Sequence, residues 1–296
     1  MGRLNTAVVP SNPIEELKKM IDDPRTYNRF HPVLGDKTKS YLSNVLSIAN
    51  NDKLLKTAEA KTILNASLQA AILDLPINQN FGFAYIVPFQ NKKENKTLAQ
   101  LQIGYKGYIQ LAIRSNKYLK INVAPLYDGQ FKRYDPIKDT LEYDLDNKKS
   151  DKITHFIGYF KLMNGFEKYL IMSVEEIDKH AKKYSQSYKK GFGVWRENFN
   201  AMAEKTVIKL LLSKYGILST ELEQALKTDQ AVIVSSDKET NEANEVIYVD
   251  TDNQYNDFIP ETKEAETIEE VEEVEVVEVV EEKEITEEIE DIEEIF

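Results

Sequence analysis

The distribution of apolar and polar residues divides the chain into helical and strand-rich stretches. From residue 13 to residue 74, apolar side chains recur at intervals of three or four, which is typical of helices that bury one face. The predicted helices are one that starts at Pro13 behind an Asn12 cap and stops before Pro24, one over Thr38–Asn51 and one over Thr57–Asp74.

The middle of the chain is rich in aromatic and β-branched residues, which favour strands. Asn164-Gly165 is the strongest hairpin turn in the sequence, and a single helix after Gly104 interrupts the strands. The predicted strands are Phe81–Gln90, Leu98–Ile103, Tyr118–Tyr127, Phe131–Tyr134, Thr140–Leu145, Ile153–Met163 and Phe166–Met172.

The last part of the pattern returns to helices. Ser173 opens one helix with a capping box, and Thr220 opens a last short helix with another. Tyr184–Gly193 has the composition of a loop, and the longest helix is predicted over Trp195–Ser213. Helices, then strands, then helices predict an α+β fold with a mostly antiparallel β-sheet core flanked by helices.

Residues 102–115 join the end of a predicted strand to a helix through Gly104 and Gly107. Glycine at these positions lets the backbone come close to another backbone or to a ligand. Lys106 and Arg114 fall on one polar, basic stripe of the helix. Such a junction could grip a phosphate or be an ordinary strand–helix junction with a solvated basic face, and the spacing alone favours the second interpretation.

Charge is distributed unevenly along the sequence. The chain carries a formal net charge of −12, but residues 261–296 contribute −16 and residues 228–260 contribute −7, which leaves +11 on residues 1–227. A basic body indicates a polyanionic partner, whereas like charges keep the acidic part extended. The predicted organisation is a flexible N-terminus at 1–12, a folded body at 13–227, a linker at 228–260 and a disordered, glutamate-rich acidic tail at 261–296.

Several classes of function find no support in the sequence. The chain has no cysteine, its three histidines lie far apart, and it lacks a glycine-lysine phosphate loop and a nucleophile elbow. It has no apolar run as long as a membrane span and no signal-peptide core, so we expect a soluble, cytoplasmic protein. No catalytic site and no cofactor is predicted, with magnesium left open.

Acidic residues between Asp135 and Asp146 support one enzymatic alternative. A magnesium-dependent nuclease, or a subunit of one, needs such a group of carboxylates. Here the acids lie in a lysine-rich, hairpin-like stretch, where solvated turn residues are the more common explanation. A further alternative is an interaction scaffold whose acidic tail is the active part.

Basic residues interleaved with aromatic residues are the richest signal. They occur in Tyr105–Arg114, Lys182–Arg196 and Lys205–Tyr215. Proteins that bind single-stranded nucleic acid use a basic groove for the backbone and aromatic faces for the bases. The alternative is that Trp195, Phe199 and Tyr215 belong to the core and the lysines keep the surface soluble.

Three blocks of this sequence resemble, in the same order, those of the RecT family of phage single-strand annealing proteins. The blocks are FGFAYIVPF at 81–89, GYKG at 104–107 running into a basic helix, and MAEKTVIK at 202–209. The resemblance covers residues 13–227. It departs from the family at Glu204, where the family often has a basic residue, and this lowers the local positive potential.

The resemblance implies an ATP-independent protein that binds single-stranded DNA and anneals complementary strands in homologous recombination and DNA repair. It implies a helix-flanked β-sheet core and a homo-oligomer, as a ring or helical filament, on single-stranded and annealed duplex DNA. The implied partners are a 5′–3′ exonuclease and a host single-strand-binding protein in a bacterial or phage-infected cell. The expected DNA-binding residues are Tyr105, Lys106, Tyr108, Arg114, Lys182, Lys183, Trp195, Lys205 and Lys209.

Three further expectations concern two lysines, the contact between subunits and the acidic tail. Lys205 and Lys209 lie off the apolar line of their helix, so their loss is expected to weaken DNA binding without opening a cavity. The helix Thr57–Asp74 and the strand Phe81–Phe89 are apolar enough to face a neighbouring subunit. The acidic tail is expected either to compete with DNA for the body, to recruit a partner through its last apolar residues, or only to solubilise the chain.

Overall fold

The computed structural model describes residues 12–91, 94–189, 191, 194–229, 231–233 and 246–248. The expectations for residues 1–11, for most of the linker and for the whole acidic tail lie outside the described residues. The helices are α1 (Pro13–Asp22), α2 (Pro24–Leu34), η1 (Gly35–Lys37), α3 (Thr38–Asn51), η2 (Leu55–Thr57), α4 (Ala60–Ile72), α5 (Tyr105–Arg114), α6 (Val174–Tyr184), α7 (Gln186–Lys189), α8 (Val194–Glu197), α9 (Phe199–Tyr215) and α10 (Thr220–Thr228).

The strands confirm an α+β fold with antiparallel pairing. Among the described residues they form four separate sheets, in the orders β1-β2, β3-β6-β7, β4-β5 and β8-β9, with all pairings antiparallel. The strands are β1 (Ala84–Asn91), β2 (Lys96–Ile103), β3 (Tyr118–Tyr127), β4 (Phe131–Asp135), β5 (Thr140–Tyr143), β6 (Ile153–Leu162), β7 (Glu167–Ser173), β8 (Ala231–Ile233) and β9 (Val246–Tyr248).

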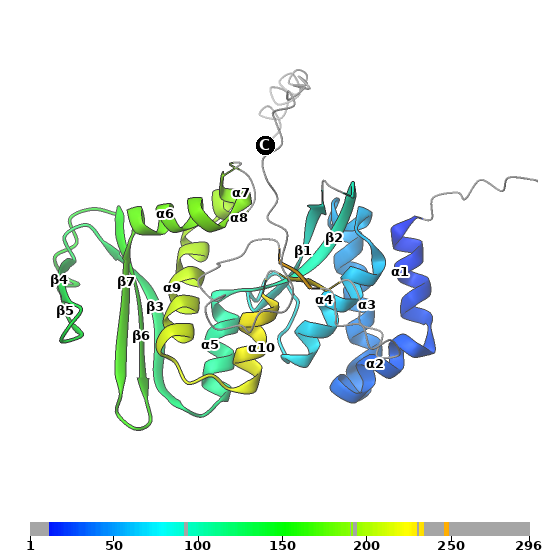
Figure 1. Ribbon diagram of the computed structural model, residues 1–296, viewed down its shortest axis with the longest axis horizontal. Helices are drawn as coiled ribbons and strands as arrows, with labels where there is room; N and C mark the ends of the chain where they lie inside the picture. Colours follow the sequence, from blue (N-terminus) through cyan, green and yellow to red (C-terminus); the bar gives the residue numbers. More distant parts are fainter. Residues whose placement is uncertain are drawn as a thin grey trace, which may run out of the picture. The chain divides into compact units, whose positions relative to one another are not determined.

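The N-terminal helices pack against the β1–β2 hairpin, with α4 next to β2 (Figure 1). Asn12 caps α1, and the helix ends before Pro24 as the sequence predicted. The helix α2 is not among the predicted helices, because Pro24 indicates the end of the preceding helix as well as the start of a new one. A proline suits the first position of a helix, and here the Asp23 side chain caps the new helix by accepting from the Arg25 N–H at 2.8 Å.

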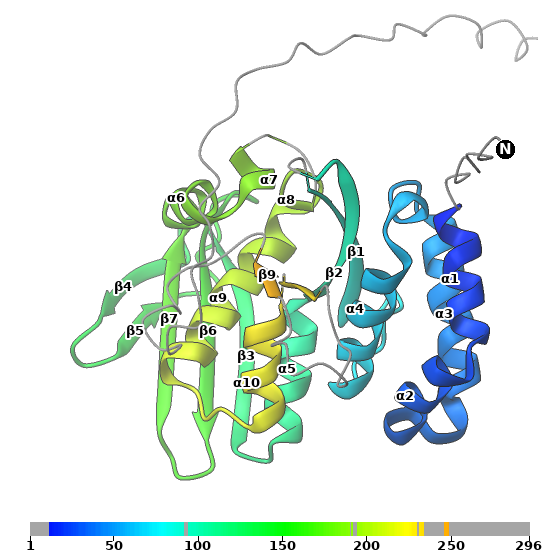
Figure 2. The same cartoon turned by 45° about the vertical axis from the view of Figure 1, so that its right-hand side comes forward.

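The three-stranded sheet β3-β6-β7 carries α9 on one face, and α9 in turn contacts α5 (Figures 1 and 2). Phe156, Phe160 and Leu162 of β6 alternate with half-exposed residues, so these buried side chains share the sheet face that contacts α9. The Asn164-Gly165 turn joins β6 and β7 as predicted, and the capping box at Ser173 starts α6. This arrangement places α9 in the middle of the core.

The long helix predicted over Trp195–Ser213 is interrupted in the structure. α8 ends at Glu197, and the Asn198 side chain accepts from the Ala201 N–H at 3.2 Å to begin α9. Asparagine is a strong N-cap residue because its side chain replaces a missing backbone acceptor. The preceding segment, expected to be a loop, contains the four-residue helix α7.

The junction between β2 and α5 is a close contact between two backbones. Gly104 is the N-cap of α5, and its N–H donates to the Phe83 carbonyl at 2.9 Å. A methyl group on Gly104 would overlap with the Gly82 carbonyl oxygen, and one on Gly107 would overlap with the Phe83 carbonyl oxygen. The glycines therefore serve packing within the protein, as in the ordinary strand–helix interpretation.

The packed body continues beyond residue 227. Asp229, Ala231 and Val232 are buried, and β8 contacts β2 and α4. These residues fall within the stretch that composition assigned to a linker. Composition missed them because the segment is short and is surrounded by polar, acidic sequence.

The apolar residues of α4 are used inside this chain rather than at its surface. Nine of its thirteen residues are buried, including Ile63, Leu64 and Ala70, while Ile72 at its C-terminal end is 39% exposed. The expectation that this helix faces a neighbouring subunit is therefore wrong, because the N-terminal helices and the β1–β2 hairpin cover it. Within the described residues no helix is both long and apolar enough to cross a membrane.

We expect Gly107→Ala to lower the free energy of unfolding by about 3 kcal/mol or more, because the new methyl overlaps with the Phe83 carbonyl and lies 2.8 Å from the Ile103 side chain. Gly165→Ala is the control: its surroundings are open, and only its φ of +90° opposes a side chain, at about 1–2 kcal/mol. Urea unfolding measures both. A smaller loss at 107 than at 165 would contradict the packing role.

Candidate nucleic-acid interface

The middle of α9 is buried on all sides. Every residue from Met202 to Leu212 is buried except Glu204, and the stretch includes Lys205 and Lys209. The two lysines are spaced by one helical turn and therefore lie on the same face of the helix. Their exposed fractions are 5% and 4%. Buried lysines require an ionic partner, and the structure supplies one.

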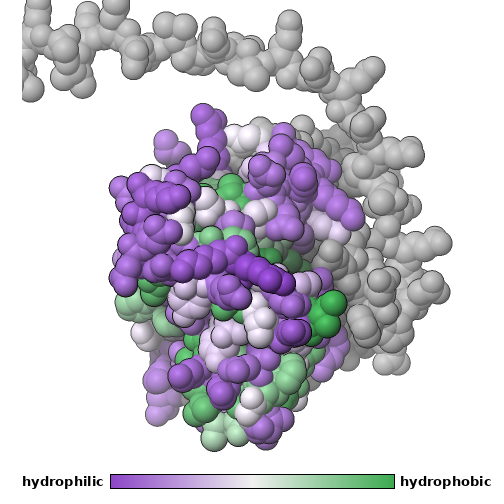
Figure 3. Space-filling model, turned by 90° about the vertical axis from the view of Figure 1, so that its left-hand side faces the viewer, coloured by the Kyte–Doolittle hydropathy of each residue, from purple (hydrophilic) through white to green (hydrophobic). Residues whose placement is uncertain are grey.

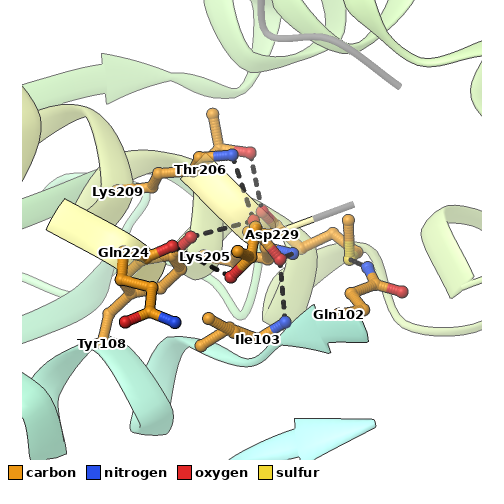
Figure 4. Close-up of polar contacts among 10 residues, drawn as sticks. Gln102, Ile103, Tyr108, Lys205, Thr206, Lys209, Gln224 and Asp229 are labelled. Atoms are coloured by element: carbon orange, nitrogen blue, oxygen red, sulfur yellow. Dashed lines mark hydrogen bonds and ion pairs between the residues drawn. The ribbon is translucent and has the colours of Figure 1, made fainter. Parts of the chain in front are cut away.

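The partner is Asp229, the residue that follows α10 (Figure 4). Its side chain has no exposed surface. Lys205 Nζ lies 3.0 Å from Oδ1 and Lys209 Nζ lies 3.0 Å from Oδ2. The Ile103 backbone N–H donates to Oδ1 at 2.8 Å, and the Tyr108 hydroxyl donates to Oδ2 at 2.9 Å. We call these five residues the Asp229 hub.

The hub keeps Asp229 ionised in spite of its burial. Burial alone raises the pKa of this carboxyl, but the charges of Lys205 and Lys209 and the hydrogen bond from the Ile103 N–H outweigh it and hold the pKa at about 2. Opposite charges and hydrogen bonds to the anion both favour the charged form. The carboxylate is thus the acceptor for donors from β2, α5 and α9.

Three residues expected to contact DNA are in this hub instead of on the surface. The burial of Lys205 and Lys209 contradicts the expectation that their loss leaves no cavity, and Tyr108 is 0% exposed. The reason is non-local: Asp229 lies 24 and 20 residues from the lysines in sequence. A DNA-binding role for these three side chains stays a prediction, and their positions within one subunit favour a role in holding elements together.

Two other expected residues, Tyr105 and Lys106, lie at the surface where α5 begins. Lys106 is exposed and Tyr105 is partly exposed. A methyl group in place of a Gly82 hydrogen would lie 3.5 Å from Lys106 Cδ and 3.3 Å from the Tyr85 hydroxyl. Glu204 of α9 lies near both Tyr105 and Lys106. We call Gly82, Tyr85, Tyr105, Lys106 and Glu204 the Lys106 surface.

The Lys106 surface combines one exposed cation with two half-exposed aromatic rings. Burial raises the pKa of the Tyr85 hydroxyl and, helped by the Glu204 and Tyr85 charges, that of the Tyr105 hydroxyl. Burial also raises the pKa of the Glu204 carboxyl, which the Lys106 ammonium opposes. Phe81, beside this surface in sequence, is 53% exposed. Aromatic faces next to a cation are the groups that bind bases and phosphates of single strands.

The remaining expected cations lie at the surface and have protein partners. The Arg114 guanidinium donates to Asp74 Oδ2 at 3.1 Å and to the Leu73 carbonyl at 2.7 Å, which joins the ends of α5 and α4. Lys182 pairs with Asp178 at 2.7 Å, and Lys183 Nζ lies 4.9 Å from the centre of the Tyr184 ring. All three side chains are solvent-accessible, so a phosphate could reach them.

Trp195 is a packed aromatic residue rather than an open stacking platform. It is 6% exposed, with its ring centre 5.3 Å from that of Tyr188 and 5.7 Å from that of Phe199. These rings, Gly191 and Arg196 line a pocket of about 600 Å³. The burial of Trp195 therefore agrees with its interpretation as a core residue.

Three of the acidic residues between Asp135 and Asp146, on and next to the β4–β5 hairpin, have structural partners. Asp135 accepts from the N–H groups of Ile137 and Lys138 in the turn, at 3.0 and 3.1 Å. Asp139 pairs with Lys168 at 2.9 Å, and Asp144 pairs with Lys132 at 3.0 Å.

The surface around this hairpin agrees with the turn interpretation. Hydrophilic side chains cover most of the face that includes it, with apolar residues between them (Figure 3). In the part of the chain that the structure describes, no three acidic or histidine side chains are grouped closely enough to hold a metal ion. The geometry thus lends the nuclease alternative no support.

Sequence reasoning missed Asp229, Tyr85 and the position of Glu204. One signal for the hub was available, because apolar residues occur on several sides of α9 and such helices are buried. Lysines within a buried helix are buried with it, and a buried lysine needs an acidic partner. Which acid they use could not be read from the sequence, because Asp229 stands among many acidic residues that follow it.

Comparisons with known proteins give matches over most of this chain. A family model described as the RecT family matches residues 39–247, which include the Asp229 hub and the Lys106 surface. The uncharacterized protein YqaK of Bacillus subtilis (strain 168) is 36% identical over 230 residues, covering 76% of this chain and 78% of YqaK. Protein RecT of Escherichia coli (strain K12) is 28% identical over 186 residues, covering 60% of this chain and 65% of RecT.

We expect Asp229→Ala to lower the free energy of unfolding by about 3–5 kcal/mol at pH 7, because two buried ammonium groups lose their shared carboxylate. Asp144→Ala is the matched control, since it removes an ion pair between exposed side chains, and such pairs contribute little. Chemical unfolding of both variants measures the difference.

The Asp229→Ala effect depends on pH with a defined sign. The folded-state pKa of about 2 lies below the ordinary value of 3.8, so the stabilisation is fully present above about pH 4 and is lost as the pH falls toward 2. The difference in free energy of unfolding between wild type and Asp229→Ala should therefore become smaller as the pH falls over this interval. A gap that is constant with pH, or no larger than that of Asp144→Ala, would show that the hub does not stabilise the fold.

Proposed function

Because the chain belongs to the RecT family, we propose that it binds single-stranded DNA and anneals complementary strands without ATP, acting as a homo-oligomer on DNA. Family membership supports roles in DNA binding, single-strand annealing and recombination. The finer features, namely ATP independence and oligomeric action, belong to the proposal.

The observation that carries the proposal is the Lys106 surface. Two expected DNA-binding residues, Tyr105 and Lys106, are adjacent and accessible there, and Tyr85 adds a second partly exposed ring near Lys106. A cation beside aromatic faces can neutralise a phosphate and stack bases without reading their identity. The excess of +11 on residues 1–227 adds attraction for any nucleic-acid strand.

The proposal includes the expected partners. Single-stranded DNA and the annealed duplex are the ligands, and a 5′–3′ exonuclease that exposes single strands, together with a host single-strand-binding protein, would act beside the annealing protein in the cytoplasm of a bacterial or phage-infected cell. The β1 strand supports assembly better than α4 does, because β1 pairs only with β2 among the described strands and leaves one strand edge for another copy.

The defining experiment mixes two complementary oligonucleotides with the full-length protein in the absence of ATP. We expect annealing faster than the spontaneous rate, with multimeric complexes on the products in electron microscopy. A parallel reaction with magnesium and a single labelled strand tests for cleavage. Cleaved strands without annealing would replace this proposal with the nuclease alternative.

We expect Lys106→Ala to weaken binding to single-stranded DNA several-fold and to reduce the slope of log Kd against log salt by about 0.7, the value for one phosphate contact on a single strand. Lys18→Ala is the control, because Lys18 is also exposed but lies on α1, at the opposite side of the N-terminal helices from α5 (Figure 2). Fluorescence anisotropy across a salt series measures both. Equal slopes for the two variants would remove Lys106 from the interface.

We also propose that the acidic tail competes with DNA for the basic body. Residues 261–296 carry −16 and are tethered to residues that carry +11, and tethering gives the tail a high effective concentration. Deleting residues 261–296 should tighten DNA binding most at low salt, where screening is weak. If full-length and truncated proteins bind equally at low salt, the tail does not compete.

A further inference from the structure

The Asp229 hub holds the Lys106 surface from both sides. Asp229 accepts from the backbone N–H of Ile103, which precedes the Gly104 turn, and from the hydroxyl of Tyr108, which follows it in the first turns of α5. Lys106 lies between these two attachment points in sequence. The same carboxylate binds two lysines of α9, and α9 contributes Glu204 to the Lys106 surface.

We propose that Asp229 is a positioning residue for DNA binding: it fixes the start of α5 against α9 so that Lys106 and Tyr105 face the strand together. This inference rests on the proposed function. Asp229 itself is fully buried and does not contact DNA; it acts through the geometry of the turn. This role gives a function to the segment after α10, which lies outside the three sequence blocks that resemble the RecT family.

The physical basis is that both anchoring bonds are short, buried and directed at one rigid anion. Hydrogen bonds to an ionised group are stronger than neutral ones, and burial excludes the water that would compete for them. The Tyr108 ring is completely buried, so its hydroxyl cannot find water without moving the helix. A loosened helix start would let the Lys106 ammonium sample positions away from the phosphate, and binding would weaken.

A competing interpretation of the same contacts predicts the opposite effect on DNA binding. Two ammonium groups, a hydroxyl and a backbone N–H around one carboxylate would also suit a phosphate group. Asp229 could then occupy an anion site that DNA takes over, and weakening the hub would tighten DNA binding. The positioning role is favoured because the carboxylate is fully buried and the lysines are at most 5% exposed, so a strand cannot reach them unless the core opens.

The test removes one anchoring bond and leaves the ion pairs in place. Tyr108→Phe keeps the ring but deletes the hydroxyl that donates to Asp229. Tyr41→Phe is the matched control, because Tyr41 also loses a hydroxyl bond, of 2.7 Å to the Ser67 carbonyl, in the N-terminal helices. All binding is measured with the full-length chain and single-stranded oligonucleotides, at a temperature well below the melting point of each variant.

We expect Tyr108→Phe to weaken binding by about threefold to tenfold, the effect of one buried hydrogen bond, and Tyr41→Phe to leave binding unchanged even if it melts earlier. The double variant Lys106→Ala/Tyr108→Phe should bind within about twofold of Lys106→Ala alone. Once the Lys106 ammonium has been removed, a displaced start of α5 has no ammonium left to move away from the phosphate. Such non-additivity is the signature of positioning, and a purely structural role would not produce it.

Three outcomes would count against the inference. Unchanged binding of Tyr108→Phe, or a loss that adds fully to that of Lys106→Ala, would show that the hub does not act through Lys106. Tighter binding of Tyr108→Phe would favour the anion-site interpretation and overturn positioning. No binding of single-stranded DNA by the wild-type chain would instead refute the proposed function itself, so the two failures are distinguishable.

Discussion

One buried carboxylate holds the centre of this protein together. Asp229 accepts donors from β2, α5 and α9 and lies at the end of α10, so elements from two distant parts of the sequence, β2–α5 and α9–α10, meet at two oxygen atoms. Burying an unpaired charge is very unfavourable, and an unpaired lysine on α9 would be as unfavourable as an unpaired aspartate. The packed core is therefore most stable when all of these partners are in place, which makes the hub a constraint on how α5 lies against α9.

This constraint separates the basic residues of the chain into two groups with different roles. Lys205 and Lys209 balance an internal anion, whereas Lys106 is exposed beside Tyr85 and Tyr105. A basic helix in a DNA-binding family need not present its charges to DNA. In the proposed positioning role its lysines orient a neighbouring surface through Asp229, and Gly107 in the β2–α5 turn leaves room for the backbone of Phe83.

Local signals predicted most of the elements because they act within a few residues. The helix over Thr38–Asn51 and the strand over Tyr118–Tyr127 have the bounds that their patterns indicated, and the Ser173 capping box begins α6. The predicted elements differ from the observed ones where one residue has two local structural roles. Pro24 ends one helix and begins the next, and Asn198 both interrupts the predicted long helix and caps α9.

The sequence by itself determined the α+β class, the antiparallel hairpins, and two members of the candidate interface, Tyr105 and Lys106, because turn chemistry, caps and periodicity are written in neighbouring residues. Only the tertiary structure decided which lysines are buried, which acid balances them and which aromatic rings remain accessible. Burial is a property of the elements packed around a side chain, and Asp229 reaches Lys205 and Lys209 through a fold in which more than a hundred residues separate it from Ile103 and Tyr108.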